Sequence, residues 1–300
     1  DMVMQLVFMA LGFGFILVFQ FVNYNILKFL AKYIYGIGIF CIFALLTPLG
    51  VERNGATRWL KIGIQFQVAE AVKVAVIIML AWIIWKYYGV ANETKLTLLL
   101  WVAGGFPAVL LLTISNDLSS SVVVLGITFL TTFVCMKTLK LHLSIFALGV
   151  SGVGLYIWNI ARNMPAPDKL EELPFRDQRI AAWLNPEMYA SNQGYQPLQA
   201  LYAIGRGGFF GNGLGSSIQK QSRLPEAQND MVLAIVAEEL GVFGIVVVVL
   251  LFIMLLFFIY MIATRGEKSI FGRVLAIGVF FHIAVQCIIN ISVVCGVFPN

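Results

Sequence analysis

The side chains most able to do chemistry gather in one stretch, Gly194 to Gly244, where a polar, glycine-rich segment leads into a very apolar one. Its charged residues are Arg206, Lys220, Arg223, Glu226, Asp230, Glu238 and Glu239. A charge beside a membrane helix costs free energy, so each one needs a structural partner or a function. Asp230 stands where the apolar run begins. A carboxylate there can cap a helix, or it can take a proton from a hydroxyl nucleophile at the membrane surface.

The same stretch contains a loop rich in glycine. Gly205, Gly207, Gly208, Gly211, Gly213 and Gly215 are followed by Ser216, Ser217 and Lys220. Glycine lets backbone N–H groups approach a phosphate closely, and the lysine adds positive charge. A tight turn without a ligand explains the same pattern. The spacing is not that of a P-loop or a dinucleotide fingerprint, and the strand that precedes those motifs is missing.

Two pairs of charged residues could serve either structure or substrate binding. Glu70 and Lys73 are three residues apart and can form an ion pair on one helix face, or Lys73 can offer its ammonium to a phosphate. Glu238 and Glu239 inside a helix require arginine or lysine partners, unless they contact substrate. Arg58 is either an anion contact or the edge of a solvated loop.

The composition is that of an integral membrane protein. Of the 300 residues, 60% are hydrophobic and 12% are charged, whereas about a quarter of a soluble domain is charged. We expect an all-α polytopic membrane protein, because apolar runs long enough to cross a bilayer recur along the chain. The predicted spans are 3–22, 33–50, 68–88, 96–114, 119–136, 142–161, 229–263 and 270–296. The seventh is longer than a bilayer requires, and a tilt or a break near its outer end, where Glu238, Glu239 and glycines 241 and 244 are expected, would accommodate the excess length.

The chain therefore divides into six spans over 1–161, a long loop over 162–228, and two spans over 229–300. Prolines and apolar residues at helical spacing predict short interfacial helices in the loop. The four cysteines lie inside apolar runs, and both histidines are isolated, so the sequence predicts no metal site from these residues.

Lysine and arginine in the short loops predict the orientation in the membrane. One set of alternate loops carries Lys28, Lys32, Lys86, Lys95, Lys137, Lys140, Arg265, Lys268 and Arg273, and the other set carries only Arg53, Arg58 and Lys61. The first set is expected to face the cytoplasm. The 51–67 and 162–228 segments then lie on the extracytoplasmic face.

The residues described so far resemble the signature of the SEDS family (FtsW, RodA and SpoVE). The similar segments are Gly205-Arg206-Gly207-Gly208, Phe210-Gly211-Asn212-Gly213-Leu214-Gly215, Leu224-Pro225-Glu226-Ala227 with Asp230, and Glu238-Glu239-Leu240-Gly241; Gly55-Ala56-Thr57-Arg58-Trp59-Leu60 with Gln67, Glu70 and Lys73; Arg179-Ile180 with Trp183; and Gln286 with Ile289-Asn290. Two segments depart from the family pattern: Gln67-Val68-Ala69-Glu70 replaces Gln-Pro-Ser-Glu, and Asn116-Asp117-Leu118-Ser119 replaces Pro-Asp-Leu-Gly. The family has ten spans, of which eight are expected here.

The resemblance implies a peptidoglycan glycosyltransferase that polymerises lipid II on the outer face of the bacterial cytoplasmic membrane, together with a class B penicillin-binding protein. It implies a catalytic role for Asp230 and substrate contacts for Arg58, Glu70, Lys73, Arg206, Lys220, Glu238 and Glu239. A divalent cation (Mg²⁺ or Mn²⁺) is a candidate cofactor whose ligands the sequence does not identify. The partners implied are lipid II, the nascent glycan and the transpeptidase, with no nucleic acid. Division, elongation and sporulation all stay open as roles.

Two other functions fit part of the pattern. A lipid II flippase would also place charges inside the membrane, but it needs polar residues through the full depth of the bilayer. The cytoplasmic halves of the predicted spans look apolar. A non-catalytic scaffold for the penicillin-binding protein predicts that Asp230 tolerates substitution.

Overall fold

The structure, a computed structural model, describes residues 2–53, 56–62, 64–219 and 230–299. Seven of the described helices are long and apolar enough to cross a membrane. They are α2 (Ile26–Ala44), α3 (Val68–Tyr87), α4 (Glu93–Ile114), α5 (Leu118–Cys135), α6 (Leu139–Arg162), α9 (Val232–Met261), which continues into the π-helix η3 (Ile262–Gly266), and α10 (Ile270–Val294). The predicted class, an all-α polytopic membrane protein, is therefore confirmed.

The first two helices follow the predicted spans to different degrees. The first span, 3–22, forms α1 (Met2–Gln20). The second helix begins at Ile26, seven residues before the predicted start at 33. Lys28 and Lys32 are inside it because each ammonium lies over a tryptophan ring, which lets a lysine remain in an apolar helix.

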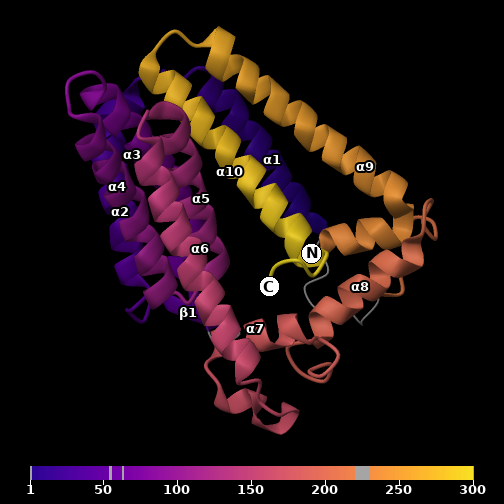
Figure 1. Ribbon diagram of the computed structural model, residues 1–300. Helices are drawn as coiled ribbons and strands as arrows, with labels where there is room; N and C mark the ends of the chain where they lie inside the picture. The colour runs from indigo at the N-terminus through magenta and orange to yellow at the C-terminus, as the bar shows by residue number, and fades with distance from the viewer. Residues whose placement is uncertain (1, 54–55, 63, 220–229, 300) are drawn as a thin grey trace.

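Helix α3 lies at the centre of the bundle. It packs against α2, α4, α5 and α10, and its side chains are buried on most sides. Small residues let the helices approach closely: a Cβ at Gly278 of α10 would lie 2.6 Å from a methyl carbon of Ile77. In Figure 1, α2 to α6 form one bundle, and α9 leans away from it before η3 returns the chain to α10.

The segment before α3 is a small antiparallel sheet, where the sequence predicts only a polar loop. Its strands are β1 (Gly50–Arg53), β2 (Ala56–Ile62) and β3 (Ile64–Gln67), in the order β1-β2-β3. Val51 pairs with Trp59, and Leu60 pairs with Phe66. Leu60 is fully buried in the main core, so the sheet is fixed to the end of the bundle.

The segment between α6 and α9 contains η1 (Pro167–Glu172), α7 (Phe175–Leu184) and α8 (Tyr195–Gly207). Helix α7 packs against the end of α6 through Ile160, Ile180 and Ala181. Helix α8 packs against the first turns of α9 through Ala203 and Ala234. Helix α7 therefore lies at the end of α6, while α8 lies beside α9, away from the α2–α6 bundle (Figure 1).

Helix α9 is broken near its start, which is one of the two outcomes that the excess length of this span predicted. Gly241 has φ 65° and ψ −161°, so the helical path is interrupted there and resumes afterwards. The left-handed φ favours glycine. A Cβ at this position would also lie 2.6 Å from the carbonyl oxygen of Phe209.

Candidate functional site

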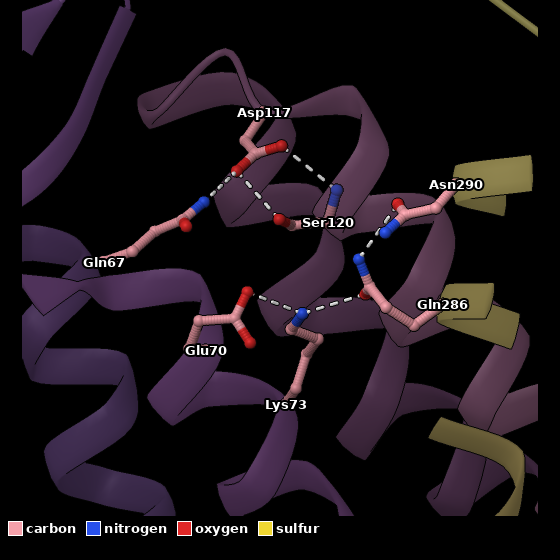
Figure 2. Close-up of polar contacts among 7 residues, drawn as sticks. All are labelled: Gln67, Glu70, Lys73, Asp117, Ser120, Gln286 and Asn290. Atoms are coloured by element: carbon pink, nitrogen blue, oxygen red, sulfur yellow. Dashed lines mark hydrogen bonds and ion pairs between the residues drawn. The ribbon is translucent and has the colours of Figure 1, made fainter. Parts of the chain in front are cut away.

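Lys73 is a buried cation on the second turn of α3. Its exposed fraction is 1%, and its Nζ donates to Glu70 Oε1 at 2.8 Å and to Gln286 Oε1 at 3.1 Å. The amide of Gln286 in turn donates to Asn290 Oδ1 at 3.4 Å. Figure 2 shows α3 and α10 presenting these side chains toward one another. Glu70 is exposed, so the ion pair neutralises the lysine while one carboxylate edge remains open to a ligand.

Asp117 is a buried carboxylate that the sequence analysis did not select. It caps α5, accepting from Ser120 N at 3.0 Å, Ser120 Oγ at 2.8 Å and Gln67 Nε2 at 3.3 Å. The bond from Gln67 joins the start of α5 to the start of α3 (Figure 2). The signal in the sequence was an acid in a very short polar turn between two spans, which is an N-cap position.

Arg58 connects β2 to that turn. Its Nη2 donates to the backbone oxygen of Asn116 at 3.2 Å, and Asn116 has a positive φ of 49°. The Nε of Arg58 is buried and has no hydrogen-bond partner among the described residues. A buried donor without a partner costs free energy, so this edge of the guanidinium is suited to receive an anion.

A cleft of about 360 Å³ opens beside the turn, under α7. Three arginines line it: Arg58 from β2, and Arg176 and Arg179 from α7. Arg176 donates to the backbone oxygen of Leu112 at 3.1 Å, while the one lining carboxylate, Asp177, accepts from the hydroxyl of Tyr156. The lining is therefore cationic.

Arg179 links the cleft electrostatically to Asp230. Burial, reinforced by the positive charge of Arg58, lowers the pKa of Arg179 to about 10. The negative charges of Asp117 and Asp230 act on this pKa in the opposite direction. The guanidinium, which also lies 4.5 Å from the ring centroid of Phe175, is protonated at neutral pH. Asp230 is exposed, just before α9 begins at Val232.

Glu238 holds the glycine-rich loop in place. It is fully buried, and its carboxylate accepts from Ser217 Oγ at 2.5 Å, Ile218 N at 3.2 Å and Gln219 N at 3.3 Å. Arg206 Nε lies 3.9 Å from Glu238 Oε1, so the predicted ion pair is present but long. Most of the compensation for the buried charge comes from the loop instead.

The glycines of the loop lie against the break in α9. Asn212 N and Gly213 N donate to the carbonyls of Glu238 and Glu239, both at 3.0 Å. In return, the amides of residues 242 and 243 donate to the carbonyls of residues 208 and 209, at 3.0 and 3.2 Å. A Cβ at Gly211 would lie 2.1 Å from the carbonyl oxygen of Glu239. Close packing on the helix explains these glycines, and the amides of 212 and 213 are already used.

Known proteins of one family are similar to this chain over nearly its whole length. The FTSW_RODA_SPOVE family model, described as cell cycle protein, matches residues 1–300. The chain belongs to this family. It is 34% identical to a probable peptidoglycan glycosyltransferase FtsW of Coxiella burnetii, over 99% of this chain and 77% of that protein. It is 32% identical to the stage V sporulation protein E of Bacillus subtilis, over 98% and 77% respectively.

Solved structures of similar proteins have the same fold. The structure titled "Structural coordination of polymerization and crosslinking by a peptidoglycan synthase complex" matches with a TM-score of 0.72 and 26% identity, covering 99% of this chain and 79% of that one. The rod shape determining protein RodA of Thermus thermophilus matches with a TM-score of 0.57 and 25% identity, over 95% and 73% respectively.

In this member of the family, the predicted site residues fall into two groups. Arg58, Glu70 and Lys73 lie around the start of α3, while Arg206 and Glu238 lie where α8 meets α9. Asp230, like Arg58 of the first group, acts electrostatically on Arg179. Glu239 lies beside Glu238 and is 8% exposed. Lys220 lies outside the described residues.

The residues near the cleft do not form a protein-only metal site. Within the described ranges, no group of three or more His, Cys, Asp or Glu side chains is arranged to hold a metal ion. Of the nearby carboxylates, Glu70 pairs with Lys73, and Asp117 is occupied by Gln67 and Ser120. Among the described residues, these two carboxylates therefore do not by themselves form a metal site.

Proposed function

We propose that this chain is a peptidoglycan glycosyltransferase that polymerises lipid II and releases undecaprenyl pyrophosphate. The named relatives support the activity. The observation that carries the proposal is the cleft under α7, which Arg58, Arg176 and Arg179 line beside the turn at Asn116. A pyrophosphate diester requires such a set of fixed donors.

The arginines bind the donor through its pyrophosphate. Arg58 has a buried Nε to spare, and Arg179 is held by its packing and by Phe175. Negative charge on the bridging oxygen grows as the glycosidic bond breaks, so fixed cations at this place stabilise the transition state more than the ground state. Lys73 and Glu70 position the sugar or the second phosphate from the adjoining end of α3.

Asp230 acts as the general base. Its carboxylate takes the proton of the acceptor 4-hydroxyl as the oxygen attacks the anomeric carbon of the donor, and the bond from that carbon to the pyrophosphate oxygen breaks. Attack opposite the leaving group inverts the configuration. Arg179, which lines the cleft, also interacts electrostatically with Asp230 and so connects the base to the phosphate-binding arginines.

The proposal also covers the location of the protein in the membrane and its partner. The excess of basic residues in alternate loops supports a cytoplasmic (inner) membrane location with the cleft on the extracytoplasmic face. A class B penicillin-binding protein is the proposed partner. The similarity to a chain from a complex that combines polymerisation with crosslinking supports this assignment.

Transport of lipid II is less well supported. Among the described residues, the buried Lys, Arg, Asp and Glu side chains are Lys73, Asp117, Glu238 and Glu239, all toward the cleft end. The other end is not wholly apolar as predicted, because Thr132 and His142 are buried there, but they bond to each other at 3.0 Å. A Cβ at Gly104 would lie 1.9 Å from Thr128 Oγ, so α4 and α5 are tightly packed.

The test is polymerisation of purified lipid II by Asp230→Asn, with Asp168→Asn as the matched control. Asp168 is also an exposed aspartate of the segment before α9, in the first turn of η1. We expect the first variant to lose about 100-fold or more of the rate, as for removal of a general base, and the second to keep it. Both should unfold at the same temperature as wild type. Retained polymerisation by Asp230→Asn would refute the assignment, and an EDTA arm tests whether the candidate divalent cation takes part.

A further inference from the structure

Three lysines gather at the end of the bundle opposite the cleft. Lys28 and Lys32 come from the first two turns of α2, and Lys86 from the last turn of α3. Lys73 and Lys86 are thirteen residues apart on α3, which is about 20 Å along a helix. The lysines therefore lie at the other membrane interface and cannot touch a substrate in the cleft.

Aromatic rings hold the three ammonium groups together. Lys32 Nζ and Lys86 Nζ both lie 4.9 Å from the ring centroid of Trp82. Lys28 Nζ lies 5.1 Å from the ring of Trp85, one helical turn further along α3. Each contact fixes a flexible side chain without consuming its hydrogen-bond donors. We call Lys28, Lys32 and Lys86, with Trp82 and Trp85, the lysine–tryptophan cluster.

The positive charge of this cluster is largely uncompensated. None of the three ammonium groups lies within 4.0 Å of a carboxylate in the part of the chain that the structure describes. Glu267 interacts with Lys28 at longer range, but its carboxylate accepts from Ser269 N at 2.8 Å. Three like charges held around two rings repel one another, so an anion between them is stabilised.

Exposed apolar side chains border the cluster. Phe29 is 81% exposed, Tyr33 is 71% exposed and Trp85 is 41% exposed. Phe29 and Tyr33 directly follow Lys28 and Lys32 in α2, and their exposure places them where acyl chains would lie in a bilayer. A ligand that fits must carry a negative phosphate at headgroup level with hydrocarbon beside it. Basic pockets between membrane helices bind anionic lipid headgroups in this way.

We propose that the lysine–tryptophan cluster is a binding site for one anionic phospholipid. The phosphate lies among the three ammonium groups, and an acyl chain follows Phe29 and Tyr33 along α2. A zwitterionic lipid presents the same phosphate with a quaternary ammonium beside it, which the lysines repel. The site is separate from the glycosyl-transfer cleft, so it does not depend on the proposed activity.

Native mass spectrometry of the full chain in detergent tests this, with dioleoylphosphatidylglycerol, dioleoylphosphatidylcholine and inorganic phosphate as separate ligands. At about 1 kcal/mol per lysine, which is about fivefold, Lys86→Gln should weaken phosphatidylglycerol binding about fivefold. The triple Gln variant should bind both lipids equally. Lys86→Arg keeps the charge and the ring contact, and it should bind like wild type.

Lys95→Gln and Lys140→Gln are the matched controls, since both are exposed lysines near helix starts on the same membrane face. They should change the binding less than twofold. The proposal is overturned if wild type does not prefer phosphatidylglycerol, or if the controls weaken it as much as Lys86→Gln does. It is also overturned if inorganic phosphate displaces the lipid at equal concentration, which would mean an ion site instead. Should the triple variant fail to fold, the single Gln and Arg variants decide the question.

Discussion

Glu238 should prove necessary for the loop and not for the chemical step. Its buried carboxylate accepts three hydrogen bonds from residues 217–219, at 2.5, 3.2 and 3.3 Å. A hydrogen bond to a charged group contributes about 1.5–3 kcal/mol. The simple sum is an upper limit, because a released loop exposes its donors to water. We therefore expect Glu238→Ala to lower the free energy of loop opening by about 2–4 kcal/mol.

Hydrogen exchange measures that quantity directly. At 1.36 kcal/mol per factor of ten, the amides of Ile218 and Gln219 should exchange roughly 30- to 1000-fold faster in Glu238→Ala. Glu238→Gln keeps one carbonyl acceptor, so the exchange rates of these amides should lie between those of Glu238→Ala and wild type. The control is Asp230→Asn, which should leave exchange of these amides unchanged while abolishing polymerisation. If Glu238→Ala lost polymerisation with unchanged exchange and unchanged unfolding temperature, then Glu238 would contact substrate and the reasoning here would be wrong.

Two further outcomes are expected. Gly207→Ala should destabilise the protein by several kcal/mol, since its Cβ would lie 1.8 Å from the carbonyl oxygen of Ala237, whereas Gly205→Ala has nothing within 4 Å and should be neutral or slightly stabilising in thermal unfolding. Gln286→Leu should reduce the rate of lipid II polymerisation about tenfold, because Lys73 loses a charge-assisted acceptor. Gln286→Glu keeps an acceptor and should restore most of the rate. If Gln286→Leu polymerised lipid II as fast as wild type, Gln286 would not belong to the site.

Much of the fold could be read from hydropathy. Because a bilayer imposes a minimum length and requires internal backbone hydrogen bonds, the predicted spans became helices. The start of α2 was misplaced because a lysine reads as polar in sequence, although Trp82 and Trp85 shelter two lysines here. The sheet at 50–67 was missed because its short strands lack a sustained alternation, and it depends on burying Leu60 in the bundle.

The site could be predicted only in part. Glu70 and Lys73 were recognisable because their spacing brings them together on one helix. The third partner of that pair, Gln286, is 213 residues from Lys73 in sequence, and no local pattern encodes the contact. Arg179 and Asp117 were noted only in segments compared with the family, and Arg176 looked like an ordinary loop residue, until tertiary packing placed the two arginines at one cleft beside the turn that Asp117 caps.

The break at Gly241 has a mechanical consequence. The break leaves the carbonyls of residues 238 and 239 and the amides of residues 242 and 243 without partners in the helix, and each of them bonds to the backbone of residues 208–213 instead. The loop and the first turns of α9 therefore form a single rigid body. The apolar part of α9 beyond Gly241 is joined to the same body, because the amides of residues 242 and 243 donate to the carbonyls of residues 208 and 209. A change in bilayer thickness, or a helix docking on this apolar part, would therefore move the loop and the carboxylates of residues 238 and 239 together with α9, instead of bending the helix freely at Gly241.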